Sequence, residues 1–275
     1  MYGLRLAISG WTKTETAITT AISQDLYGGF YFRGVDQQFK TLAEAYLGIV
    51  IATELIQISL PQVYRHRPLY NLPLYHELGH FLDVHHSITP YTFMLSDATS
   101  LLPSLPAGLP KDTLHNIHIN HRMEYFADLF GASFTGLAYG DFLQAFAGAN
   151  SISLTHPATS DRLTVIDDFL NGKSNPIVEL FCTALSNLKL PELKAQFSAP
   201  DLNESFDNVR PYLIQSDAEA HGILDSGWHY LQTAWTSPTG LWAEMDEAKI
   251  EQTVNDLIEK STRNRMIVTK WGGGK

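Results

Sequence analysis

The chain has 275 residues, 44% of them hydrophobic, so it can bury a substantial core in one large domain or two modest ones. Its formal net charge of −10 at pH 7 argues against nucleic acid or an anionic membrane surface as the main partner. The one cysteine, Cys182, excludes an internal disulfide, and its apolar neighbours at 177–181 predict a packing residue rather than a nucleophile.

Residues 1–65 have the pattern of an N-terminal α/β segment. A short strand is expected at 4–9 and a second at 30–35, after a Gly-Gly pair. Between them, a polar helical stretch is expected from about Thr12. A longer helix is expected over 36–59, where apolar residues dominate.

The most apolar run, 43–60, contains two glutamates and is shorter than the roughly 20 residues that a transmembrane helix needs. The sequence also begins without a positively charged leader followed by an apolar core. We therefore expect a soluble, cytoplasmic protein with no transmembrane segment.

The tripeptide Pro-Leu-Tyr occurs twice, at 68–70 and 73–75. Proline disfavours helical backbone in the residue before it, so this region predicts an extended lead-in to the next helix. An extended segment at 66–72 would be able to pair with a substrate strand.

A helix is expected from about Pro73, with Asn71 as its cap. Its apolar positions recur at helical spacing and predict a buried stripe made of Leu74, Leu78, Phe81 and Leu82. The opposite side of the same helix then faces a cleft.

That opposite side carries the most informative motif, because residues 76–80 read His-Glu-Leu-Gly-His. At 3.6 residues per turn, His76 and His80 lie within ~40° of each other and can bind one ion. Glu77 projects to the side, where it can act on a water molecule as general base. This pattern is a signature of zinc hydrolases, so we expect Zn²⁺ as the cofactor.

A catalytic zinc site needs a third protein ligand. His86 is one candidate, although Asp83 stands where comparable motifs have a glycine that turns the chain back to the metal. The other candidate is Glu124, on an expected second helix whose phenylalanines recur every four residues over 126–134. Asp128, one turn later, would be placed to accept the N–H of a ligand histidine. Taken alone, the pair Glu124 and Asp128 fits a solvated acidic face better.

The connector 87–112 between the two expected metal helices contains four prolines. A connector of this length is uncommon unless it serves as a lid or binding loop, so we expect it to border the cleft. His115, His118 and His121 follow it at intervals of three. These histidines fit a polar helix start, a lid histidine near the zinc, or an extra metal site, and only His121 stays near the helical face of Glu124.

Three motifs in order resemble those of the gluzincins, specifically the HtpX-type and CAAX-prenyl-protease family of zinc metallopeptidases. In that family a His-Glu-x-x-His helix precedes a Glu-x-x-Ala-Asp helix and a Thr-His-Pro stretch with an arginine a few residues on. This chain has the first at 76–80, the second at 124–128 and the third at 155–157, with Arg162. The similarity covers roughly residues 66–172.

The resemblance implies roles residue by residue. His76 and His80 would be the first two zinc ligands, Glu124 the third, and Glu77 the general base. Members of this family are integral membrane proteins, and this chain shows no span. Prenylated or membrane-embedded substrates therefore do not carry over to it.

The resemblance also implies three supporting residues. Asp128 would lie behind the ligands as a partner of a ligand histidine. His156 would line the cleft near the developing oxyanion, and Arg162 would help to hold that region. His156 has a second interpretation, as a residue that merely precedes Pro157 at a helix start.

After 171–172, Asn-Gly, the remaining sequence of 173–275 is expected to be helical and carries no motif. Its apolar residues near 223–235 and 250–258 predict packing against the catalytic part. The alternative is an exposed aromatic patch for a regulator or substrate.

The expected fold is mainly α (α+β), a zincin-like fold with a small β-sheet and extra helices. Residues 1–65 form an N-terminal segment, 66–172 the catalytic core and 173–275 a C-terminal helical region. The expected function is zinc-dependent hydrolysis of peptide bonds in a peptide or protein substrate. Two alternatives remain: a non-catalytic or latent zinc-binding protein whose site is closed by a protein side chain, and a dedicated regulatory protease with one partner substrate.

Overall fold

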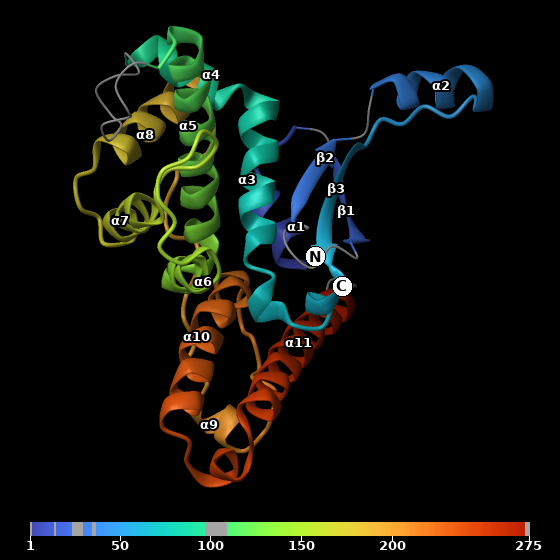
Figure 1. Cartoon of the computed structure of the whole chain (residues 1–275). Coiled ribbons are helices and arrows are strands. Elements are labelled where there is room, and N and C mark those ends of the chain that lie inside the picture. The colour runs from blue at the N-terminus through green and yellow to red at the C-terminus, as the bar shows by residue number, and fades with distance from the viewer. Residues whose placement is uncertain (1, 14, 24–29, 35–36, 97–108, 273–275) are drawn as a thin grey trace.

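The structure is a computed structural model that describes residues 2–13, 15–23, 30–34, 37–96 and 109–272. It is mainly helical with one small sheet, which confirms the predicted mainly α (α+β) class. The sheet lies on one side of α3 (Pro73–His86), and α5 (Lys111–Thr135) lies on the other, so α3 is the middle layer (Figure 1). A second group of helices, α9 to α11, extends away from the sheet and α3.

The other elements, in chain order, are α1 (Tyr2–Ile8), β1 (Thr16–Ser23), β2 (Tyr31–Gly34), α2 (Gln37–Leu47), β3 (Glu54–Pro61), η1 (Gln62–Tyr64), η2 (Pro68–Tyr70), α4 (Ile88–Leu95), α6 (Leu137–Ala147), α7 (Thr159–Leu170), α8 (Pro176–Leu188), α9 (Asn203–Asp207), α10 (Asp217–Thr236), η4 (Gly240–Glu244) and α11 (Glu247–Gly272).

The described strands form a three-stranded sheet in the order β1-β3-β2. β1 is parallel to β3, with Thr16 opposite Glu54, and β2 is antiparallel to β3, with Tyr31 opposite Ser59. β2 is therefore an edge strand, and it lies against α3. This arrangement puts the backbone edge of the sheet beside the helix that carries the His-Glu-x-x-His motif.

Two of the predictions for the first 35 residues are wrong, and one is confirmed. The expected strand at 4–9 is helical in α1, because Leu4, Ala7 and Ile8 share one helical face and are buried together. The expected helix from Thr12 gives way to β1, whose sequence is rich in the β-branched residues threonine and isoleucine, which favour a strand. The strand predicted at 30–35 is confirmed as β2.

The predicted helix over 36–59 is correct only in its first half. α2 ends at Leu47, and Gly48 follows with φ of +64°, a backbone conformation that stops the helix. The second half is β3, in which Ile56 and Ile58 are buried and Gln57 between them is exposed. This alternation has the period of two that is typical of a strand.

The predicted extended lead-in at 66–72 is also wrong. Pro68 and Pro73 each occupy a first-turn position, the former in η2 and the latter in α3, where their missing N–H costs nothing. Leu72 has helical φ and ψ of −54° and −39°, and Asn71 donates its side-chain amide to the Tyr64 carbonyl instead of capping α3. The segment therefore offers no extended backbone to a substrate.

The apolar stripe predicted on α3 is confirmed, because its four members are buried in the core between the sheet and α5. The aromatic face predicted on α5 is confirmed as well, with Phe126, Phe130 and Phe134 all buried. A second core cluster lies among η2, α6, α10 and α11. The first cluster therefore holds α3 against α5, and the second packs α6, α10 and α11 together.

The C-terminal region is helical as predicted, and α7 ends at Leu170, just before the expected stop. Buried positions on its long helices include Ile223, Trp228, Leu231, Ile250, Val254, Leu257 and Ile258. Cys182 is half-buried on α8, and burial raises the pKa of its thiol.

In the described part of the predicted lid at 87–112, α4 packs on α8 and α5 begins at Lys111. Its stretch 97–108 lies outside the described residues. Within the described part of the chain, no helix combines the length and the apolar character that crossing a bilayer requires.

A buried histidine on α10, His221, contacts α3 and makes folding stability depend on pH. His221 is 3% exposed, and its Nδ1 lies 3.1 Å from the hydroxyl of Tyr75 on α3. Burial lowers the pKa of His221 to about 4, although the charge of Asp217 acts in the opposite direction. The unfolded chain binds this proton below pH ~6.5, whereas the folded chain binds it only near pH 4.

Folding stability is therefore expected to fall as pH drops from 6.5 to 4, with His221 contributing about 3 kcal/mol of the loss. His221→Gln should flatten this part of the curve in urea unfolding measured across pH. His66→Gln, which removes an exposed histidine side chain, should leave it unchanged. An equally steep curve in His221→Gln would show that another group controls the acid limb.

Candidate metal centre

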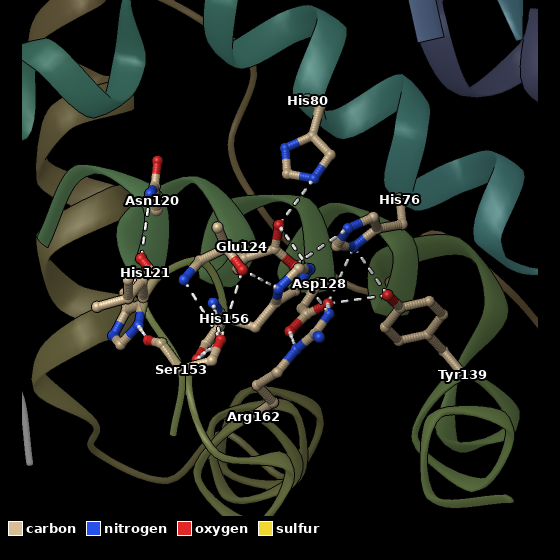
Figure 2. A network of polar contacts seen from close by, with 12 residues as sticks. His76, His80, Asn120, His121, Glu124, Asp128, Tyr139, Ser153, His156 and Arg162 are labelled. Carbon is tan, nitrogen blue, oxygen red and sulfur yellow. Dashed lines mark hydrogen bonds and ion pairs between the residues drawn. The ribbon is translucent and has the colours of Figure 1, made fainter. Parts of the chain in front are cut away.

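Two histidines of α3 and one carboxylate of α5 point at a common centre (Figure 2). Nε2 of His76 lies 3.5 Å from Oε2 of Glu124, and Nε2 of His80 lies 3.3 Å from Oε1. One ligand atom from each of the three residues lies within 4.8 Å of the others, so the group can hold a metal ion. All three side chains are largely shielded from solvent.

The close approach of α3 and α5 depends on Gly79. A Cβ built at this position would lie 2.8 Å from Cα of Ala127 and 3.1 Å from Cβ of Phe130. Because these neighbours belong to the backbone and to a buried ring, they cannot move aside cheaply. Gly79 thus sets the distance between the helix of the two histidines and the helix of Glu124.

Gly79→Ala is expected to push the two helices apart and to destabilise the protein by about 1–3 kcal/mol, despite the better helix propensity of alanine. Affinity for a metal ion should fall with it, because His76 and His80 lie on one of the two helices and Glu124 lies on the other. Gly140→Ala on α6 is the matched control, since its Cβ would meet only ordinary contacts at 3.5 and 3.8 Å. Thermal unfolding and metal titration of both variants measure this, and equal behaviour would refute the role of Gly79.

Asp128, Arg162 and Tyr139 support the His76 ring from behind. Nδ1 of His76 lies 3.0 Å from Oδ1 of Asp128 and 2.8 Å from the hydroxyl of Tyr139, which in turn donates to Asp128 at 2.8 Å. Arg162 donates to both oxygens of Asp128, at 2.7 and 2.6 Å. With its hydrogen held at Nδ1, a neutral His76 presents a free Nε2 to a metal.

Arg162 forms ion pairs with both Asp128 and Glu124, because its guanidinium also lies 3.3 Å from Oε2 of Glu124. Burial works against charge on Glu124, yet His76 and His80 hold the pKa of this carboxyl well below its ordinary value. Burial likewise opposes ionisation of Asp128, but Arg162 lowers its pKa to about 2. Both carboxylates are therefore ionised at neutral pH.

His76 responds to the same charges in the opposite direction. Burial alone would lower its pKa, but the contacts with Asp128 and Glu124 outweigh burial and raise the pKa to about 10. Without a cation at the centre, the ring is therefore protonated at neutral pH. A metal ion that binds Nε2 must displace this proton, so binding releases protons and weakens as pH falls.

The remaining two residues predicted for the site lie at its edges. His156 precedes α7, its side chain is half-exposed, and its Nε2 lies 3.6 Å from Oε1 of Glu124. Glu77 lies on α3 between the two histidines, is half-buried, and makes no hydrogen bond or ion pair with the described residues. The structure thus brings six of the predicted site residues into one connected group, with Glu77 next to it in sequence.

The alternative third ligand, His86, is wrong. Its Nε2 donates to the carbonyl of Trp11 at 2.9 Å, away from the centre. Asp83 explains the difference from a chain that turns back to the metal, because its carboxylate accepts both the N–H and the hydroxyl of Thr89 at 2.6 Å. The chain passes Ser87, with φ of +54°, directly into α4.

The three histidines of α5 do not form an extra metal site among the described residues. His115 packs against the ring of Phe93, and His118 is buried. His121 is fully buried and its Nε2 donates to the carbonyl of Ser153 at 2.8 Å.

Sequence reasoning missed Tyr139, whose hydroxyl touches both His76 and Asp128. The residue belongs to α6, and nothing in its sequence neighbourhood marks it, because only the turn at Gly136 brings α6 back onto α5.

The chain matches no protein-family model, and no curated protein and no solved structure is significantly similar to it.

Proposed function

We propose that the protein is a zinc-dependent metallopeptidase of the gluzincin type, with His76, His80 and Glu124 as ligands and Glu77 as general base. The observation that carries the proposal is that these three residues form a group able to hold a metal ion, which no fourth histidine, cysteine, aspartate or glutamate of the described residues joins. Structural zinc sites use four protein ligands, whereas catalytic sites use three and leave a position for water or substrate.

The spacing of the ligand atoms supports zinc. Ligand atoms at about 2.0–2.1 Å from a tetrahedral ion are roughly 3.3 Å from one another. Glu124 oxygens lie 3.3 and 3.5 Å from the two Nε2 atoms, which is longer than a charge-assisted hydrogen bond of about 2.7–2.9 Å. Oε2 of Glu124 is also buried without a hydrogen bond, and its ion-pair partners are His76 at 3.5 Å and Arg162 at 3.3 Å.

Zinc bound by these three residues would supply Lewis acidity and lower the pKa of a water toward neutrality. The chain's own groups do the rest of the work in this proposal. Glu77 takes a proton from the attacking water and returns it to the departing amine. Asp128 and Tyr139 keep Nδ1 of His76 protonated, and His156 donates a hydrogen bond toward the carbonyl oxygen as charge develops there.

The substrate class follows from the position of β2. This edge strand lies beside α3, and the ring of Phe32 stacks 6.4 Å from that of His80. A free strand edge can add the backbone of an extended peptide, with affinity from main-chain hydrogen bonds. We propose that a substrate peptide lies along β2 with its scissile bond at the metal, and an inhibitor peptide bound away from β2 would contradict this.

The alternative of a closed or latent zinc site is favoured less. His115 and His118 do not join the ligand group, and neither does His156, the third histidine that would be able to plug it. A dedicated regulatory protease would use the same chemistry and would differ only in its range of substrates.

Metal removal tests the proposal. Protein stripped with a chelator is expected to lose hydrolysis of a peptide library, and one equivalent of zinc per chain is expected to restore it. Cleaved bonds are read by mass spectrometry, and metal content by elemental analysis. Full zinc content without any cleavage of the library, or of a cell lysate, would favour the non-catalytic alternative.

A further inference from the structure

Two side chains of α5 hold the turn that carries His156 (Figure 2). His121 donates from Nε2 to the carbonyl of Ser153 at 2.8 Å, and Asn120 donates its side-chain amide to the carbonyl of Leu154 at 3.1 Å. His121 is fully buried, and both residues lie about one helical turn before Glu124. The helix that supplies the third ligand therefore also anchors this turn.

Hydrogen bonds within the turn fix its shape. The Ser153 hydroxyl accepts from the N–H of His156 at 2.9 Å and donates to the carbonyl of the same residue at 3.2 Å. The backbone N–H of Ser153 reaches that carbonyl as well, at 2.9 Å. The N–H of Thr159 closes the segment on the Asn150 carbonyl at 3.0 Å, where α7 begins.

The hydroxyl of Thr155 lies 2.8 Å from Nδ1 of His156, while Nε2 of the same ring faces the Glu124 carboxylate. A neutral imidazole carries its hydrogen on one nitrogen only. An ionised carboxylate accepts and never donates, so it favours the hydrogen on Nε2. Nδ1 then accepts from Thr155, and Nε2–H points into the site.

We propose that Asn120, His121 and Thr155 are positioning residues for His156. Asn120 and His121 set the place of the turn beside Glu124, and Thr155 donates to Nδ1 and so supports the ring form that the Glu124 carboxylate favours, with the hydrogen on Nε2. The inference takes its chemistry from the proposed hydrolysis: a donor held toward the developing oxyanion binds the transition state more tightly than the ground state. The positions of these residues follow from the hydrogen bonds and the ion pair described above.

The placement is tested on zinc-loaded protein without a substrate. Asn120→Leu and His121→Phe keep side-chain shape but remove the donors, and are expected to speed amide hydrogen exchange over 153–159 by about tenfold or more, because the turn loses its anchors. His121→Gln can return a donor near the place of Nε2 and should restore protection. Exchange that is unchanged in both donor-free variants would overturn the anchoring role.

The ring form is tested by nitrogen-15 shifts of the His156 imidazole. Wild type and Thr155→Ser are expected to show the hydrogen on Nε2, whereas Thr155→Val should populate both ring forms. The same spectrum in Thr155→Val and in wild type would overturn the role of Thr155.

Kinetics show whether these residues act through His156. On a fluorogenic peptide chosen from the library cleavage, Asn120→Leu is expected to lower kcat by about tenfold with little change in KM, and to have no further effect in a His156→Ala protein. An equal loss with and without His156 would overturn the positioning role. Absence of hydrolysis in wild type would instead count against the proposed function, while exchange and ring shifts still decide the placement.

Discussion

Glu77→Gln is expected to lower kcat for peptide hydrolysis by roughly 10²–10⁴-fold, while the protein still binds one zinc. The amide keeps the size of the side chain but cannot accept a proton from the attacking water. Glu77 is half-buried and makes no polar contact with the described residues, so the substitution breaks no described ion pair or hydrogen bond. Single-turnover cleavage of a library-derived peptide and elemental analysis of the same sample measure both effects.

The control is Glu44→Gln, which makes the same chemical change on the exposed surface of α2. This variant should keep wild-type turnover and zinc content. If Glu77→Gln cleaved peptides at the wild-type rate, the base would be another group, and the proposed use of the His-Glu-x-x-His motif would be wrong.

Glu124→Gln is expected to lose zinc affinity by more than the roughly 10–100-fold that follows loss of a partner behind the ligands. The carboxylate contacts both Nε2 atoms and Arg162, and its charge offsets that of the metal. An amide of the same shape removes this charge from a site in which Arg162 stays positive. Competition titration against a chelator of known affinity measures the change.

Glu124→Asp is the graded control for this prediction. The shorter carboxylate keeps the charge but retreats from the centre, so zinc affinity should lie between wild type and Glu124→Gln. Far-ultraviolet circular dichroism of the zinc-free proteins separates metal loss from misfolding. Wild-type affinity in a folded Glu124→Gln would show that the third ligand is a different residue.

Helical periodicity is what made the core of the site predictable. His76 and His80 share a face of α3 because they are four residues apart. The apolar stripe of the same helix predicted which other face is buried in the core. The phenylalanines of α5 likewise predicted its core face, and Glu124 and Asp128 share another face, which contacts His76 of α3.

The strands were harder to predict, because β3 lies within a long apolar run that has the pattern of a helix and β1 has no clear alternation of apolar and polar residues. Residues 36–59 have the pattern of one apolar helix, but the connector 48–53, which begins at Gly48 with its positive φ, separates α2 from β3. β1 is polar on much of its surface, so it lacks the clean alternation that marks a half-buried strand. Its parallel pairing with β3 is a long-range contact that no local rule anticipates.

Tertiary contacts account for the residues and roles that sequence reasoning missed. Gly79 occupies one of the two unspecified positions of the His-Glu-x-x-His motif, and its importance follows only from the close approach of α5 to α3. Tyr139 reaches His76 across 63 positions, and His121 holds Ser153 across 32. Both contacts join different elements, so no helical or strand periodicity predicts them.

A crystal structure of the zinc-soaked protein, with anomalous diffraction recorded at the zinc edge, is the most direct test. One anomalous peak is expected between Nε2 of His76, Nε2 of His80 and the Glu124 carboxylate, with a water as the remaining ligand. A peak elsewhere in the molecule, or a fourth protein side chain bound to the metal, would contradict the proposed catalytic zinc centre.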